Sequence, residues 1–132
     1  MTEGDYVKFR VDGIPIQQGS KTLVRRGSKA WMIDANISKL KPWREKVAAA
    51  ADCGVTFDCP VSVHMLLHMP MPNRPKFRRP ATKPDADKLA RAINDSLTAG
   101  GLISDDSRIV ELHVIEEYSE LPGVTVTVRE VQ

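Results

Sequence analysis

Apolar and polar positions alternate along four segments of the chain, and this two-residue period predicts strands with one buried face. The segments are residues 7–11, 61–69, 110–114 and 124–128. Two further apolar segments, 22–24 and 30–33, flank the run Arg25-Arg26-Gly27-Ser28. This arrangement predicts a β-hairpin with cations at its tip.

Two other segments have apolar residues about four positions apart, which is the period of a helix with one buried face. The first, residues 42–52, begins with a proline, a residue tolerated in a first turn. The second, residues 87–99, is followed by two glycines that we expect to end the helix. The stripes are Trp43, Val47 and Ala50 or Ala51 in the first segment, and Leu89, Ile93 and Leu97 in the second.

The order of these elements predicts an α+β fold with one mixed sheet of about four to six strands and two main helices. A length of 132 residues fits a single domain, 1–132. Hydrophobic residues make up 42% and charged residues 27%, which is typical of a globular protein. No apolar run reaches the length of a membrane helix. The first five residues are polar and acidic, unlike a secretory signal, so we expect a cytoplasmic protein.

Two cysteines and two histidines offer an alternative chemistry, because their donor atoms suit zinc. The residues are Cys53, Cys59, His64 and His68. Five residues separate the cysteines, which fits no usual zinc finger, and both histidines fall in a predicted strand. We therefore interpret the cysteines as free thiols and the histidines as strand residues.

The net charge of +2 hides a division within the chain. Residues 1–91 carry seventeen of the nineteen Lys and Arg against nine acids, a net +8, whereas residues 92–132 carry a net −6. Many of the cations fall in predicted loops, between 21 and 46 and between 74 and 91. Clustered cations favour a polyanionic partner such as nucleic acid. The alternative is a solvated basic surface.

The run Lys83-Pro84-Asp85-Ala86-Asp87 carries the strongest chemical signal. Pro84 disfavours helical backbone at Lys83, so we expect Asp85 and Asp87 to lie in extended chain just before the second helix. Residues two apart in extended chain point to the same side. Two adjacent carboxylates repel each other unless a proton or a cation compensates. Magnesium would do so and keep bound waters for chemistry.

A third acid could come from Asp105 or Asp106, at the start of the next strand, provided that this strand runs back beside the helix N-terminus. Each acid also has an ordinary structural explanation. Asp87 suits a helix N-cap, and the pair at 105 and 106 suits a turn. Arg91 lies four residues after Asp87 and four before Asp95, as in a surface ion-pair ladder.

Three runs resemble the RusA family of Holliday junction resolvases, also called crossover junction endodeoxyribonucleases. They are KPDADKLARA at 83–92, NDSLTA at 94–99 and SDDSRIV at 104–110, with a weaker likeness at 9–19 and 41–44. In that family an Asp-x-Asp pair opens a helix, and an Asp-Asp pair opens the next strand.

The resemblance implies site residues and a cofactor. It places the family's essential acids, the ligands of the catalytic metal, on Asp85, Asp87 and Asp106. The family's functional lysine is Arg91 here, which keeps the charge but cannot readily release a proton. The family's asparagine after the second acid is Lys88, which could take over part of the lysine's role. The implied cofactor is Mg2+, with Mn2+ as a substitute.

The resemblance further implies hydrolysis of four-way DNA junctions in recombination and repair, by a homodimer of bacterial or phage origin. We expect the clustered cations to bind the DNA backbone; they are Lys21, Arg25, Arg26, Arg74, Lys76, Arg78, Arg79, Lys83 and Lys88. One rival is a module of the same fold that binds branched DNA without cutting it. A sugar transferase also uses Asp-x-Asp, but 132 residues leave little room for its donor and acceptor sites.

Overall fold

The computed structural model describes residues 5–19, 21–34 and 36–132. In these residues the elements follow the order β1 (Tyr6–Asp12), β2 (Lys21–Arg26), β3 (Lys29–Asp34), α1 (Ile37–Ala51), β4 (Val61–Pro70), α2 (Ala86–Ala99), the short 3-10 helix η1 (Asp106–Arg108), β5 (Ile109–Ser119) and β6 (Gly123–Glu130). The predicted α+β fold is confirmed. No helix in the described part of the chain is long and apolar enough to cross a membrane.

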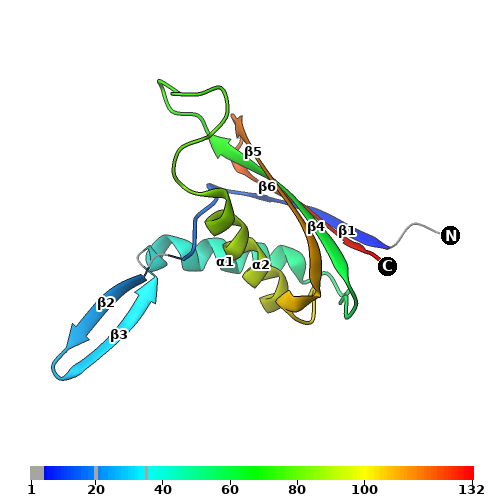
Figure 1. Ribbon diagram of the computed structural model, residues 1–132, viewed down its shortest axis with the longest axis horizontal. Helices are drawn as coiled ribbons and strands as arrows, with labels where there is room; N and C mark the ends of the chain where they lie inside the picture. The colour runs from blue at the N-terminus through cyan, green and yellow to red at the C-terminus, as the bar shows by residue number, and fades with distance from the viewer. Residues whose placement is uncertain (1–4, 20, 35) are drawn as a thin grey trace.

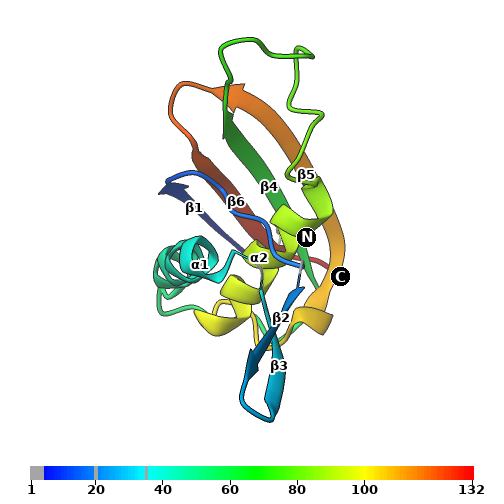
Figure 2. The ribbon, with the colours of Figure 1, turned by 90° about the vertical axis from the view of Figure 1, so that its left-hand side faces the viewer.

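The main sheet is mixed and has the strand order β1-β6-β4-β5. Strands β4 and β5 are parallel, and α2 forms the crossover between them. The other two neighbouring pairs are antiparallel. Both helices lie on the same side of the sheet (Figures 1 and 2). Helix α2 returns from the end of β4 to the start of β5. The N-terminal end of α2 therefore lies level with the C-terminal part of β5.

The hairpin predicted around residues 25–28 is present, but β2 and β3 form a separate two-stranded sheet. The expectation of a single sheet is therefore corrected at this point. Figure 1 shows the hairpin projecting away from the helices and the main sheet. Its short strands are joined by a tight turn at its tip, and among the described residues they pair only with each other.

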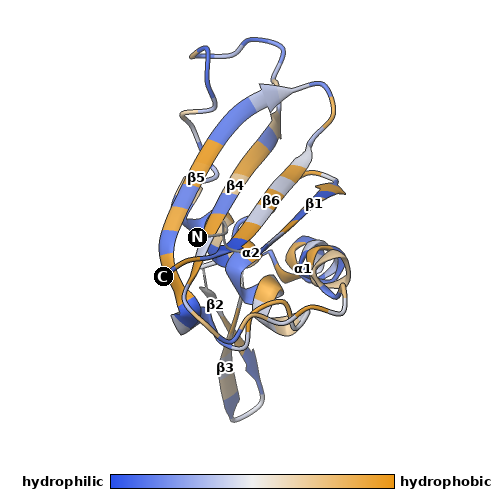
Figure 3. Ribbon diagram, turned by 90° about the vertical axis from the view of Figure 1, so that its right-hand side faces the viewer, coloured by the Kyte–Doolittle hydropathy of each residue, from blue (hydrophilic) through white to orange (hydrophobic). Residues whose placement is uncertain are grey.

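Alternation along the strands builds the core, as the two-residue period predicted. In β4 every second residue from Val61 to Met69 is buried, and in β6 the same holds for Val124, Val126 and Val128. Figure 3 shows this alternation of apolar and polar positions along both strands. The buried positions face the helices, whose buried residues include Leu40, Trp43, Val47 and Ala51 in α1 and Leu89, Ile93 and Leu97 in α2.

Helix α1 begins at Ile37, five residues before the predicted start, and Pro42 lies inside it. A proline there removes one backbone hydrogen bond. Burial offsets that loss, because Leu40 is completely buried in the turn before the proline. The prediction from proline alone was wrong here, since tertiary packing outweighs the local preference.

Strand β5 departs from the predicted pattern at Val110. The pairing with β4 shifts register between Val61 and Ser62, so Val61 pairs with Ile109 and Ser62 with Glu111. Val110 is the extra residue of this bulge and is 60% exposed. A bulge reverses the faces of the residues on one side of it. Beyond the bulge, Leu112, Val114, Glu116 and Tyr118 share the register of the buried β4 residues.

Candidate active site at the N-terminal end of helix α2

Asp85 occupies the N-cap position of α2 with extended backbone, φ −73° and ψ 142°. Extended backbone at this position confirms the expectation that Asp85 lies in extended chain just before the helix. Aspartate is a preferred N-cap because its carboxylate accepts a backbone N–H of the first turn. The carboxylate of Asp85 makes no such bond. Its side chain is 51% exposed, and its Oδ2 lies 3.9 Å from Nζ of Lys88. This carboxylate is therefore not engaged in capping.

Asp87 lies in the first turn of α2 and is exposed. The expectation that both acids lie in extended chain was wrong for Asp87, because the helix begins at Ala86. Asp85 occupies the N-cap position, so the helical residues start immediately after it. A negative charge in the first turn is favoured by the helix dipole. Both acids nevertheless lie at one end of α2, as the sequence predicted.

The segment before the hairpin packs across the exposed face of α2. The backbone N–H of Gln18 donates to the carbonyl oxygen of Lys88 at 3.0 Å, and the amide of Gln18 donates to Asp95. A Cβ at Gly19 would lie 3.4 Å from Nη1 of Arg91. Arg91 thus lies next to this segment, and it is exposed one helical turn from both Asp87 and Asp95.

Asp106 lies at the opposite end of α2 from Asp85. Its carboxylate accepts a hydrogen bond from Thr98, in the last turn of the helix. Burial raises the pKa of Asp106; the bond from Thr98 lowers it, and the neighbouring acid Asp95 raises it further. Helix α2 has fourteen residues, which at 1.5 Å per residue makes it about 20 Å long. The structure therefore brings Asp106 to Asp95 and not to Asp85 or Asp87.

The turn that carries Asp106 also explains its neighbour. The carboxylate of Asp105 accepts the backbone N–H of Ser107 at 2.9 Å and caps η1. Asp58 holds the same turn by accepting hydrogen bonds from Oγ of Ser104 at 2.6 Å and Nε of Arg108 at 2.9 Å. Asp105 thus has the structural role in a turn that the sequence suggested as an alternative.

Glu116 is an acid that the sequence analysis missed. It pairs in register with the buried Leu67 of β4, so its side chain leaves the sheet on the side of the helices. Its Oε1 is buried and has no hydrogen-bond partner among the described residues. Burial raises the pKa of Glu116, the charge of Asp85 raises it further, and Arg79 lowers it. An acid at the core-facing positions of a strand was the signal in the sequence.

A pocket of about 240 Å3 lies between the proline-rich loop and β5. Its lining includes Lys83 and Pro84, which precede Asp85, and Glu116 and Tyr118 of β5. Arg79 holds the loop against the strand by donating to the carbonyl oxygen of Glu116 from Nε at 3.3 Å and Nη2 at 3.0 Å. The loop and the strand thus place Glu116 beside the two residues that precede Asp85.

These residues suit a divalent cation of the magnesium type. Among the described residues no group of three or more His, Cys, Asp or Glu side chains could hold a metal ion by itself. Magnesium commonly binds through one or two carboxylates, with waters and substrate phosphates completing its shell. The unused carboxylate of Asp85 and the unpartnered oxygen of Glu116 are donors of that kind.

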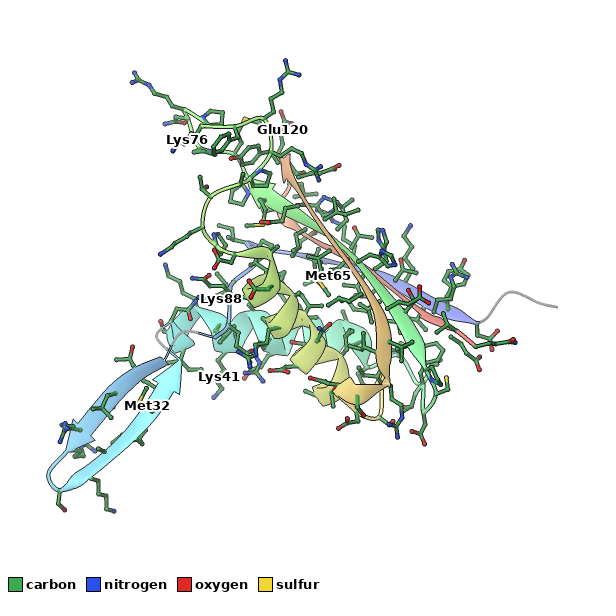
Figure 4. All side chains as sticks on the ribbon, in the orientation of Figure 1. Met32, Lys41, Met65, Lys76, Lys88 and Glu120 are labelled. Carbon is green, nitrogen blue, oxygen red and sulfur yellow. The ribbon has the colours of Figure 1, made fainter. Side chains whose placement is uncertain are left out.

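The predicted DNA-binding cations fall into three groups. Those of the hairpin tip and of the loop are exposed, and Lys88 is partly buried. Arg25 and Arg26 lie at the hairpin tip, Arg74, Lys76, Arg78, Arg79 and Lys83 lie in the loop before α2, and Lys88 lies in α2. The side chain of Lys21 lies outside the described residues. Figure 4 shows the loop on one side of the N-terminal part of α2 and the hairpin on the other.

The two cysteines are free thiols, as expected. His64 stacks on His113 with ring centroids 5.8 Å apart, and His68 lies 2.9 Å from the hydroxyl of Thr125. These histidines share the sheet face that points away from the helices, so they are strand residues and lie outside the candidate site.

Comparison with known proteins identifies the family. Residues 12–129 match the family model described as endodeoxyribonuclease RusA. This chain belongs to that family. The matched range includes both acids at the start of α2, Arg91, Glu116 and Asp106. The RusA family is one of nucleases that act on DNA, and the resemblance seen in the sequence is thereby confirmed.

A curated relative extends the likeness over almost the whole chain. The uncharacterised protein YqaN of Bacillus subtilis (strain 168) is 35% identical over 140 residues, covering 96% of this chain and 98% of YqaN. The two chains thus match in length as well as in sequence. Because that protein is itself uncharacterised, the family match is what links the chain to an activity.

Proposed function

We propose that this protein is a metal-dependent endodeoxyribonuclease that resolves four-way DNA junctions in recombination and repair. The observation that carries the proposal is the RusA match over residues 12–129, together with an Asp85 carboxylate that makes no capping bond at the start of α2. Asp85 and Asp87 are the acids that would hold Mg2+, or Mn2+ in its place.

Each residue has a stated task in this proposal. Asp85 and Asp87 would hold a divalent cation, which when bound would supply activation of water and neutralisation of charge on the scissile phosphate. Arg91, exposed on the same helix, binds a phosphate oxygen pair through its guanidinium, which stays charged throughout. Lys88, 3.9 Å from Asp85, adds a second cation beside the phosphate.

Asp106 enters the proposal from the family resemblance alone. In this chain it lies beside Asp95 and Thr98, at the other end of the helix face on which Arg91 is exposed. Any role of Asp106 in cleavage would therefore be at the C-terminal end of α2. Loss of cleavage in Asp106→Asn, with the folded structure retained, would assign it a role in the reaction.

The cations on the hairpin and in the loop would hold the DNA on either side of the site. Phosphate contacts position a duplex without reading its sequence, which suits recognition of a junction by shape. A four-way junction has two-fold symmetry, and its resolution needs two cuts. A homodimer with two active sites is the matching assembly.

Substitution of the acids tests the proposal. We expect Asp85→Asn and Asp87→Asn to bind a synthetic four-way junction but to cut it about a hundredfold more slowly, or not at all, because they weaken the metal site. Asp52→Asn is the matched control, since Asp52 is an exposed acid at the end of α1. Cleavage at the wild-type rate by both site variants would contradict the proposal.

A second candidate function is a module that binds branched DNA without cutting it. The separation of Asp106 from Asp85 favours it, as does the arginine at position 91. This alternative predicts tight junction binding by the wild-type protein and no nicks with any divalent cation. The same cleavage assay therefore distinguishes the two functions.

A further inference from the structure

We infer that Glu116 is a metal-binding residue of this protein, and that it joins Asp85 and Asp87 in holding the divalent cation. This inference rests on the proposed function and adds to it a residue from β5, outside the runs that resemble the family. The cation is one that prefers oxygen ligands, such as Mg2+ or Mn2+.

The position of Glu116 in the sheet is the first argument. It pairs with Leu67, which is completely buried on the helix side of β4. Leu112 and Val114 precede it at the same register. Glu116 is half-buried, and an acid at such a position loses part of its hydration without gaining packing. A ligand for its carboxylate would offset that loss.

The state of its carboxylate is the second argument. Oε1 of Glu116 has no contact with solvent and no hydrogen-bond partner within the described part of the chain. A buried carboxylate oxygen without a partner is costly. Arg79 donates from Nε and Nη2 to the backbone carbonyl oxygen of Glu116, so these bonds leave Oε1 of the carboxylate unsatisfied. A cation is the partner that such an oxygen lacks.

The position of Asp85 is the third argument. Its carboxylate makes no capping hydrogen bond, and its side chain is 51% exposed at the N-terminal end of α2. Lys83 and Pro84, immediately before Asp85, line the same pocket as Glu116. Asp85 has one half-exposed ion pair, with Lys88, whereas Oε1 of Glu116 has no hydrogen-bond partner among the described residues. Neighbouring carboxylates repel each other until a cation compensates their charge. Asp85 and Glu116 provide carboxylates of the kind that magnesium sites commonly use.

Glu117 is a natural control for Glu116. It is the next residue of β5, is exposed and pairs in register with His68. Successive residues of a strand point to opposite faces of the sheet, so its side chain lies on the face without helices. The two glutamates therefore have the same chemistry but only one of them faces α2.

Calorimetric titration of the full-length protein with Mn2+ tests the inference without using cleavage. We expect Glu116→Gln to bind Mn2+ roughly tenfold or more weakly than the wild type, and Glu117→Gln to bind it as the wild type does. Glu116→Asp keeps the carboxylate and is expected to bind more tightly than Glu116→Gln. Melting temperatures without metal check the fold, and Mg2+ should raise that of the wild type more than that of Glu116→Gln.

Two results would overturn the inference, and they are distinguishable. If Glu116→Gln binds Mn2+ as tightly as the wild type, or if Glu116→Asp binds no better than it, Glu116 is not a ligand. In that case a wild-type protein that still cuts junctions leaves the proposed function intact. If the wild type binds no Mn2+ and cuts no junction, the proposed function and the inference fail together.

Discussion

Asp85 and Glu116 are placed in ways that reduce the stability of the folded chain. A capping hydrogen bond stabilises a helix by about 0.5–2 kcal/mol, and Asp85 makes none. Glu116 has a buried oxygen without a partner in the described residues. Residues of binding sites often carry such costs, because their groups are kept for a ligand. These two side chains therefore point to binding more strongly than to folding.

Gly100 shows the opposite case, a residue required by packing. A Cβ at this position would collide with the carbonyl oxygen of Ala48 and lie 3.0 Å from Cβ of Ala51, where α2 ends against α1. We expect Gly100→Ala to lower the free energy of unfolding by about 1–3 kcal/mol, as in other overpacked sites. Urea denaturation measures this change, and the neighbouring exposed substitution Ala99→Ser is the control. An unchanged free energy of unfolding would show that the helices separate at no cost.

The sequence could locate only part of the site. The proline before Asp85 and the apolar stripe after it define the start of α2, so both acids there were found. Asp106 was expected beside them because its distance from the helix end cannot be read from spacing alone. Glu116 was missed because the predicted strand ended at residue 114, although Glu116 continues the alternation of Leu112 and Val114. The position of Asp106 depends on how the turn after α2 packs, which spacing does not encode.

At the scale of elements, the periodic patterns predicted every strand and both helices. They did so because one face of each element is buried, and burial imposes the period. The start of α1 was wrong, since packing of Leu40 outweighs the cost of Pro42. The projection of the hairpin was not predicted. Its two strands pair only with each other, so their pattern does not reveal their position relative to the sheet.

The hairpin tip provides a prediction of its own. If Arg25 contacts a DNA phosphate, Arg25→Ala should weaken junction binding at low salt and reduce the slope of log affinity against log salt by about 1. The fold should be unaffected, because the hairpin projects from the core (Figure 1). Lys8→Ala is the control, since Lys8 is an exposed cation on β1. Fluorescence anisotropy at several salt concentrations measures both, and an equal change in the two variants would contradict a DNA-binding hairpin.

At the scale of the whole molecule, the distribution of charge and the shape of the chain both favour a polyanion bound across the start of α2. The net +8 of residues 1–91 includes the cations of the hairpin and the loop, which extend on either side of the start of α2 (Figures 1 and 4). A flexible polyanion held at both extensions would cross the end of the helix that bears Asp85 and Asp87. On the proposed function, a phosphate of that polyanion would lie beside these acids.

The most direct test of this account is the response of junction cleavage to metal. A synthetic four-way junction is incubated with the wild-type protein in Mg2+, in Ca2+ and in excess chelator, and the nicks are mapped on all four strands. We predict paired nicks, symmetric about the branch point, in Mg2+ and none with chelator. Ca2+ is expected to support binding without cutting. Equal cleavage in chelator, or binding without nicks in Mg2+ and Mn2+ alike, would contradict a metal-dependent junction nuclease.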